Sequence, residues 1–244
     1  MRRFFLDQQP TSDGRLTITG PEVHHLKNVL RLKVGARVLF FDGRGGECEA
    51  ELEQLGSHEI TARIISCRQE DAERCRVSLA QGLLTGQKMD LVVQKATELG
   101  LSTIIPFTSR YCATREASAN KIQRWQRIAR EACKQCQRTR EPEILPVTTW
   151  TECLAKADEH DLTVVFWEKE TTHTLEDLRT LIGQRPPASL LFLIGSEGGL
   201  ADEEIAQARE KNAQIITLGK RILRAETASI AAATLVQYLV GNLN

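Results

Sequence analysis

Two stretches near the C-terminus constrain the fold of this chain more than any other feature. Each reads as a buried strand that ends in a glycine-bearing turn and continues into a helix. The first is the apolar run 189–194 followed by GSEGG at 195–199, and the second is 215–218 followed by GKRILRAETA at 219–228. In an open parallel sheet, turns at the carboxyl ends of strands bind ligands, and glycine lets backbone approach a ligand closely. The two turns therefore predict one ligand site, with tight packing of the turns as the alternative.

From residue 77 onward the pattern is one of strands alternating with helices. Apolar runs predict strands at 77–84, 103–107, 163–167, 190–194 and 215–218, and apolar residues at helical spacing follow the first of them. This alternation is typical of a parallel α/β sheet. A helix at 202–211 opens with three acidic residues, and a final helix at 227–240 is apolar on nearly every side. We expect the final helix to be buried, in part at a subunit interface.

Residues 1–70 have a different pattern, in which short apolar runs alternate with turn signals. Period-two alternation at 48–52 and 59–65 is typical of half-buried strands. The cluster DGRGG at 42–46 predicts a hairpin turn. These features predict a small β-rich, barrel-like unit with one helix near 21–31, joined to the rest of the chain by a polar linker at 68–74.

Composition limits the class of protein. With 244 residues, of which 41% are apolar and 26% charged, the chain is long enough for a proper core and too mixed to be disordered. The longest apolar runs are far short of the ~20 residues that span a membrane, and no secretory signal is visible. Seven cysteines, an odd number without regular spacing, predict reduced thiols and a cytoplasmic protein. Cys133 and Cys136 form a CxxC that we interpret as helix packing, because no second pair or nearby histidine accompanies it.

Charge gives evidence for nucleic acid only locally. The chain has 32 basic and 32 acidic residues, so its net charge of zero does not favour a nucleic-acid partner. Residues 121–140, however, hold seven basic side chains and one acidic one. At 100° per residue, one helical arc carries Arg124, Arg127, Arg130, Lys134 and Arg138. This basic stripe predicts phosphate contacts, with a merely solvated face as the alternative. A second basic cluster, at 24–33, suits phosphate contact or capping better than metal binding.

The motifs resemble a known family. GSEGG at 195–199 and LGKRILRAETA at 218–228 are similar to the C-terminal signature of the SPOUT class of S-adenosylmethionine (SAM)-dependent RNA methyltransferases. Within that class the chain resembles the RsmE family, which methylates a uridine of small-subunit (16S) ribosomal RNA at N3. The resemblance covers nearly the whole chain, including MRRFF at 1–5, HHLKNVLRL at 24–32, QKATELG at 94–100 and EACKQ at 131–135. The family usually has proline where Ser196 stands.

The resemblance implies a two-module enzyme. Residues 1–70 would form a PUA-like RNA-binding β-barrel domain, and residues 75–244 a SPOUT-like, trefoil-knotted parallel α/β methyltransferase domain. The cofactor would be SAM, without a metal, and the partners would be 16S ribosomal RNA or the assembled 30S subunit and a second copy of the chain. The two turns would hold the cofactor through Leu193, Ile194, Gly195, Glu197, Gly198, Gly199, Leu218, Gly219, Ile222 and Leu223. The RNA contacts would be Arg2, Arg3, His25 and Arg31 from the first module, with Arg124, Arg127, Lys134 and Arg138 from the basic stripe.

Arg224 and Glu226 are the candidate catalytic residues. Neutral uridine N3 has no available lone pair, so its proton must leave as the methyl group arrives. Arg224 could stabilise the resulting anion, and Glu226 could orient that arginine or act as the base. A structural ion pair between the two is the alternative.

Three other functions stay open or are disfavoured. The same fold could methylate another RNA or another position, such as a ribose 2′-hydroxyl. The chain could also be a non-catalytic RNA-binding or ribosome-assembly factor, in which case it would not bind SAM. A nucleotide-binding oxidoreductase is disfavoured, because no Gly-x-Gly-x-x-Gly follows an early strand.

Overall fold

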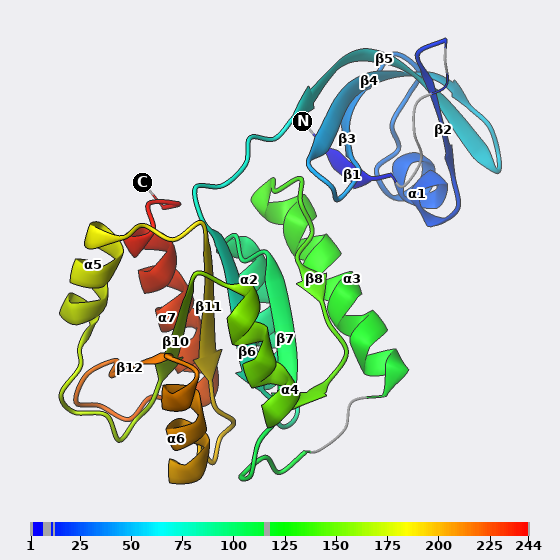
Figure 1. The fold of residues 1–244 in the computed structure, drawn as a ribbon. Coiled ribbons are helices and arrows are strands. Elements are labelled where there is room, and N and C mark those ends of the chain that lie inside the picture. Colours follow the sequence, from blue (N-terminus) through cyan, green and yellow to red (C-terminus); the bar gives the residue numbers. More distant parts are fainter. Residues whose placement is uncertain (1, 7–10, 12, 115–117, 244) are drawn as a thin grey trace. The chain divides into compact units, whose positions relative to one another are not determined.

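The chain folds into two compact units, which are described separately (Figure 1). The computed structural model describes residues 2–6, 11, 13–114 and 118–243, so Met1 of the MRRFF stretch lies outside it. The first unit comprises Met1–Ala72 together with Cys133–Glu141, and the second comprises Glu73–Ala132 together with Pro142–Asn244. No helix in the described part of the chain is both long and apolar enough to cross a membrane.

A parallel sheet forms the centre of the second unit. Its strands lie in the order β12-β10-β11-β6-β7-β8, with β9 also pairing with β7. Every pairing in this sheet is parallel. The strands are β6 (Arg76–Gly82), β7 (Thr103–Thr108), β8 (Glu143–Ile144), β9 (Thr148–Thr149), β10 (Leu162–Phe166), β11 (Ser189–Ile194) and β12 (Gln214–Ile216). The parallel α/β fold predicted from the strand–helix alternation is confirmed.

Helices cover both faces of this sheet, which is why its central strands are buried along nearly their whole length. Alternate strand residues divide into two cores, so that Phe192 packs with one set of helices and its neighbour Leu191 with the other. On the Phe192 face lie α2 (Lys88–Glu98), α5 (Leu175–Gln184), α7 (Ala225–Leu239) and the part of α3 (Ala119–Cys136) that contains Trp125. On the Leu191 face lie α4 (Trp150–Ala155) and α6 (Asp202–Glu210), with a short 3-10 turn at Lys156–Glu159 after α4.

The first unit is built on a five-stranded sheet with the order β1-β3-β4-β5-β2 (Figure 1). Its strands are β1 (Arg3–Phe5), β2 (Arg15–Thr19), β3 (Arg37–Phe41), β4 (Gly46–Leu55) and β5 (Glu59–Gln69). β1 pairs with β3 in parallel, and the other neighbours are antiparallel. The predicted hairpin turn at 42–46 lies between β3 and β4, as expected.

Two predictions for the first unit need correction. The helix expected near 21–31 is shorter: α1 (Pro21–His24) continues as a π-helical turn, His25–Val29, and Arg31 then adopts a φ of 50°. The predicted linker at 68–74 begins too early, because β5 extends to Gln69. Arg68 is held in this strand by its Nε atom, which donates to Glu47 Oε2 over 2.7 Å.

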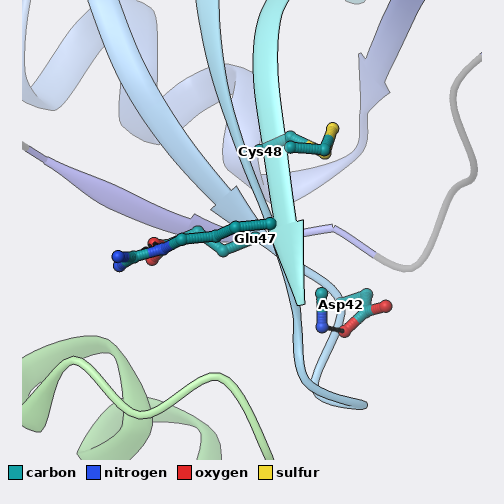
Figure 2. The surroundings of a disulfide bond; sticks show 6 residues. Asp42, Glu47 and Cys48 are labelled. Carbon is teal, nitrogen blue, oxygen red and sulfur yellow. Dashed lines mark hydrogen bonds and ion pairs between the residues drawn. A yellow bond between two sulfur atoms is a disulfide. The ribbon is translucent and has the colours of Figure 1, made fainter. Parts of the chain in front are cut away.

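The prediction of reduced thiols is wrong for one pair of cysteines. Cys48 on β4 and Cys67 on β5 face each other in the strand register and form a disulfide (Figure 2). The two residues are 19 positions apart, and only strand pairing brings them together, so their spacing gave no sign of the bond. The remaining five cysteines are free, including Cys133 and Cys136, which both lie on α3.

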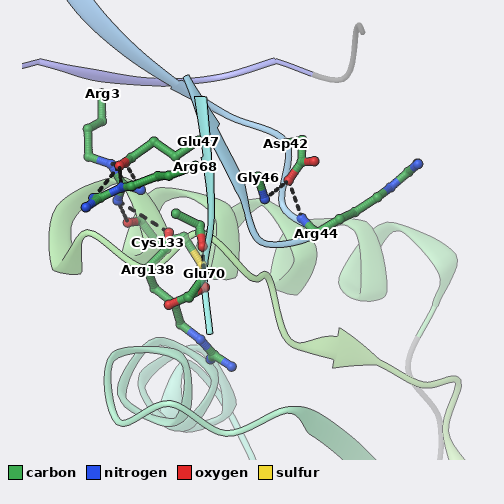
Figure 3. A network of polar contacts seen from close by, with 10 residues as sticks. Arg3, Asp42, Arg44, Gly46, Glu47, Arg68, Glu70, Cys133 and Arg138 are labelled. Carbon is green, nitrogen blue, oxygen red and sulfur yellow. Dashed lines mark hydrogen bonds and ion pairs between the residues drawn. The ribbon is translucent and has the colours of Figure 1, made fainter. Parts of the chain in front are cut away.

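A polar network attaches residues 133–141 to the sheet of the first unit (Figure 3). Arg3 Nε donates to Glu47 Oε1 over 2.8 Å, and both side chains are almost fully buried, at 5% and 3% exposure. Arg3 Nη1 donates to the carbonyl oxygens of Cys133 and Arg138, at 3.2 and 3.3 Å. The Thr139 hydroxyl donates to the Glu70 carboxylate. Arg3 is therefore a structural residue of this unit.

Candidate functional site

A cavity of about 400 Å³ lies at the carboxyl ends of β10, β11 and β12 in the second unit. This volume is typical of sites for small molecules and cofactors. Four chain segments line it: the end of β10, the turn after β11, the turn from β12 into α7, and the start of α2. Its lining residues are Lys88, Phe166, Trp167, Glu168, Ile194, Gly195, Ser196, Glu197, Gly198, Gly199, Thr217, Leu218, Gly219, Arg221, Ile222, Leu223, Arg224, Ala225, Glu226 and Ala228.

The structure thus brings the two glycine-bearing turns around one cavity. Nine of the ten residues assigned to cofactor binding from the sequence line it: Ile194, Gly195, Glu197, Gly198, Gly199, Leu218, Gly219, Ile222 and Leu223. Leu193 does not. Because successive residues of a strand face opposite sides of the sheet, Leu193 is buried in the core beneath α4 and α6, while Ile194 faces the other side.

Glycine is required at Gly199, in the turn after β11. Gly199 has a φ of +73°, which residues with a Cβ rarely adopt. A Cβ at this position would also overlap the Glu168 carboxylate at the end of β10. The positive φ is therefore what requires glycine here, and it leaves the Gly199 backbone close to the Glu168 side chain.

Glu197 fixes the same turn to a loop after β6. Its Oε1 atom accepts hydrogen bonds from the Thr85 backbone N–H (3.0 Å), the Thr85 hydroxyl (2.7 Å) and Lys88 Nζ (2.9 Å). Partial burial acts to raise the pKa of Glu197, but the bonds from Lys88 and Thr85 outweigh it and lower that pKa to about 2. Glu197 is therefore ionised at neutral pH, and it ties the turn to the start of α2.

Two polar atoms at the cavity lack protein partners. Ser196 Oγ and Glu226 Oε2 are both buried without a hydrogen-bond partner, although both residues line the cavity. Buried polar atoms without a partner are uncommon and costly, so these atoms indicate a ligand with polar groups. Arg224 lies at the same cavity with an exposed side chain. The structure describes both Arg224 and Glu226 and gives no ion pair between them, which removes the support for the structural alternative.

Outside the two glycine-bearing turn segments, the sequence interpretation missed four lining residues. Phe166 ends β10, Trp167 and Glu168 follow it, and Lys88 begins α2. The position of 166–168 at the carboxyl end of a predicted parallel strand was a usable signal. Lys88 offered no such signal, because its place at the cavity depends on Glu197, which lies 109 residues away in the sequence.

Comparison with known proteins decides the family. A model of the RNA methyltransferase domain matches residues 71–237, and a model of the RNA methyltransferase PUA domain matches residues 18–65. The chain is 31% identical to the ribosomal RNA small subunit methyltransferase E of Bacillus subtilis, with 98% of this chain and 96% of the relative covered. The chain belongs to the RsmE family of RNA methyltransferases.

Solved structures of similar proteins include two with a bound cofactor. The RsmE protein of Neisseria gonorrhoeae, solved with SAM, is 33% identical, with a TM-score of 0.87 over the full length of both chains. A methyltransferase of Legionella pneumophila, also solved with SAM, is 28% identical, with a TM-score of 0.84 over 97% of this chain and 96% of the other. The PUA-like and α/β parts of the predicted fold are thus both confirmed.

The RNA-contact residues assigned to the first unit of this RsmE family member lie in different surroundings. Arg2 is exposed and donates to the Leu30 carbonyl over 3.2 Å, and Arg31 is exposed. His25 Nδ1 lies 3.6 Å from Glu22 Oε2, and Lys134 Nζ donates to Glu22 Oε1 over 2.7 Å. Glu22 therefore contacts both His25 and Lys134, although these two residues are far apart in the sequence. Arg3 is the exception, because its burial against Glu47 leaves it unavailable to a ligand.

The basic stripe on α3 is interrupted in two ways. Gln137 adopts a φ of 65°, so the helix ends at Cys136 and Arg138 lies beyond it rather than on the predicted arc. Acidic groups from other segments also meet the stripe: Arg124 Nη2 lies 2.6 Å from Asp90 Oδ2, and Lys134 bonds to Glu22. The mutual repulsion expected from the sequence is thus partly relieved. Arg127 remains exposed on the helix.

Proposed function

We propose that this chain transfers a methyl group from SAM to N3 of a uridine in small-subunit (16S) ribosomal RNA. The main support for the proposal is that both glycine-bearing turns line one cavity and that Arg224 and Glu226 line it as well. Membership of the RsmE family supports the substrate, and the relatives solved with SAM support the cofactor.

The cavity residues fit such a cofactor. The cavity volume of about 400 Å³ is large enough for a ligand of this size. Ile194, Leu218 and Leu223 would supply apolar walls, and the backbone around Gly195 and Gly199 would lie against the ligand. The unpartnered Ser196 Oγ and Glu226 Oε2 would bond to polar groups brought into the cavity during the reaction.

The chemistry rests on two side chains. When bound, SAM supplies a methyl carbon made electrophilic by the adjoining sulfonium. Glu226 accepts the uridine N3 proton, for which its unpartnered oxygen is available. Arg224 stabilises the charge that develops on N3 and its flanking carbonyl oxygens. The target base must be unstacked for N3 to be reached.

We assign RNA binding to basic residues of both units. The candidates are Arg2, His25, Arg31, Arg127 and Arg138, with Arg124 and Lys134 retained as weaker ones because Asp90 and Glu22 already hold them. Arg3 is left out, because its side chain is buried. The domain boundaries 1–70 and 75–244 and the trefoil knot stay predictions.

A second copy of the chain is part of the proposal. One side of α7 packs into the core through residues such as Ala232 and Val236, but Tyr238 on the same helix is 66% exposed. The family resemblance is the support for a homodimer, and the exposed Tyr238 leaves α7 able to form part of its interface. A ribosomal substrate would place the protein in the cytoplasm.

A transfer assay tests the function. The protein is incubated with methyl-labelled SAM and small ribosomal subunits that lack the modification, and the RNA is digested for nucleoside mass spectrometry. The expected product is 3-methyluridine. A different methylated nucleoside would keep the fold and cofactor but contradict the target. No product together with no SAM binding would indicate a non-catalytic RNA-binding factor.

A further inference from the structure

A buried amide connects the two turns that enclose the cavity. Gln81 lies near the carboxyl end of β6, in register with Ile194 of β11, and its side chain is fully buried. A buried primary amide is costly unless its hydrogen-bonding groups find partners. Gln81 is not among the cavity-lining residues, so a direct contact with a ligand does not explain it.

Every strong hydrogen-bonding group of this amide is used. Gln81 Nε2 donates to the Gly195 carbonyl over 3.2 Å and to the Gly82 carbonyl over 3.0 Å. On the other side, Gln81 Oε1 accepts from the Ser229 hydroxyl. The amide orientation is fixed, because the opposite one would place its oxygen against two carbonyl oxygens.

The partners of Gln81 belong to the two turns. Gly195 begins the turn after β11. Ser229 lies in the first turns of α7, and its Oγ is also 2.8 Å from the carbonyl of Ala225, the residue between Arg224 and Glu226. The connection from Gly195 through Gln81 and Ser229 thus reaches the segment that carries both catalytic candidates.

Close packing at the neighbouring residue supports the same connection. A Cβ at Gly82 would come within 2.8 Å of the Gly195 carbonyl carbon, so the end of β6 lies directly against the turn after β11. Two contacts therefore set the spacing between the turn after β11 and the start of α7. Gly82 packs directly against Gly195, and Gln81 bonds to Ser229.

We propose that Gln81 is a positioning residue for methyl transfer, which through Ser229 fixes Arg224 and Glu226 relative to the donor-binding turn. The inference rests on the proposed function. Because displacements of about 1 Å can slow an enzymatic reaction by roughly a hundredfold, a looser connection should lower kcat more than it weakens SAM binding.

The test uses Gln81→Met, which keeps the volume but removes the hydrogen bonds. The matched control is Gln237→Met, because Gln237 is a buried amide on α7 that donates to the Leu99 carbonyl, away from the turns. We expect Gln81→Met to lower kcat at least about tenfold with the Kd for SAM changed less than about threefold, and Gln237→Met to keep kcat within about twofold. A kcat within twofold in Gln81→Met, or an equal loss in the control, would overturn the proposal.

A second, smaller substitution controls for the possibility that Gln81→Met fails to fold. Ser229→Ala removes only the hydroxyl, and we expect a several-fold loss of kcat that is not additive with Gln81→Met, because both changes break one connection. Additive losses, or full activity in Ser229→Ala, would count against the connection. Wild-type activity separates the two hypotheses: an inactive wild type contradicts the proposed function, whereas an active wild type with an equally active Gln81→Met contradicts only the role of Gln81.

Discussion

Glu197 Oε1 lies 2.9 Å from Lys88 Nζ and joins the turn after β11 to the start of α2, with both residues lining the candidate cofactor cavity. The Thr85 backbone and hydroxyl donate to the same oxygen. A single ionised carboxylate thus holds two segments that are more than a hundred residues apart.

This carboxylate should make stability depend on pH in the acid range. The folded-state pKa of Glu197 is about 2, below its ordinary value of 4.5. A carboxyl group whose pKa is lower in the folded state than in the unfolded state stabilises the fold at pH values above its ordinary pKa. This stabilisation is lost as the pH falls toward the folded-state pKa. We expect Glu197→Gln to lower the free energy of unfolding by about 1 kcal/mol at pH 7, because solvent screens part of the interaction of this exposed residue. The difference from wild type should shrink between pH 4.5 and pH 2 in thermal unfolding; a difference that stays constant with pH would contradict it.

Arg224→Ala should reduce methyl transfer and leave the cofactor in place. Removing one group that stabilises transition-state charge costs about 100- to 1,000-fold in kcat, whereas the walls of the cavity are unchanged. Lys220→Ala is the matched control, because Lys220 is an exposed cation in the same turn that does not line the cavity. Single-turnover rates and calorimetry with SAM measure the two effects. Equal rates in wild type and Arg224→Ala would remove Arg224 from the mechanism.

Arg127→Glu should weaken RNA binding in a salt-dependent way. Arg127 is an exposed member of the basic stripe, and a phosphate contact is its proposed role. Loss of one phosphate contact lowers the slope of log K against log salt by about 1. Arg179→Glu on α5 serves as a control with the same charge change. Unchanged RNA affinity of Arg127→Glu at low salt would show that the stripe is a solvated face that does not bind RNA.

Titration of thiols should separate the cysteines into two groups. The disulfide between Cys48 and Cys67 leaves five free thiols. Burial raises the pKa of Cys153 and Cys133 to about 12 and that of Cys75 to about 11, so these thiols should react slowly in the folded protein. In denaturant without reductant we expect five reactive thiols, and seven after reduction. Seven before reduction would show that the bond is absent.

The sequence predicted the centre of the sheet better than its edges. β6, β10 and β11 are buried on both faces, and so they appear as mainly apolar runs, of which 190–194 is uninterrupted. β8 and β9 have two residues each and leave no such run. α4 and α5 were missed although both begin with a capping box, Thr149 with Glu152 and Thr174 with Asp177, which is a readable signal.

The site was predicted where chemistry is local in sequence and missed where it depends on distant segments. Both glycine-bearing turns carry their own signal, and both line the cavity. The partners of Glu197, the bonds of Gln81 and the burial of Arg3 against Glu47 arise only from tertiary contacts. Arg3 lies close to the start of the sequence, where an arginine is expected to be solvated. Nothing in its spacing from Glu47 indicates that the two side chains are buried together.

The most direct test of the account is calorimetric titration of SAM into wild type and Ala228→Phe. Ala228 lines the cavity, so a phenyl ring there should fill part of it, whereas Ala206→Phe on the exposed side of α6 should not. We expect wild type and Ala206→Phe to bind SAM with the same affinity and Ala228→Phe to bind it at least about tenfold more weakly. Equal binding by all three proteins, or no binding by wild type, would contradict the assignment of this cavity to the methyl donor.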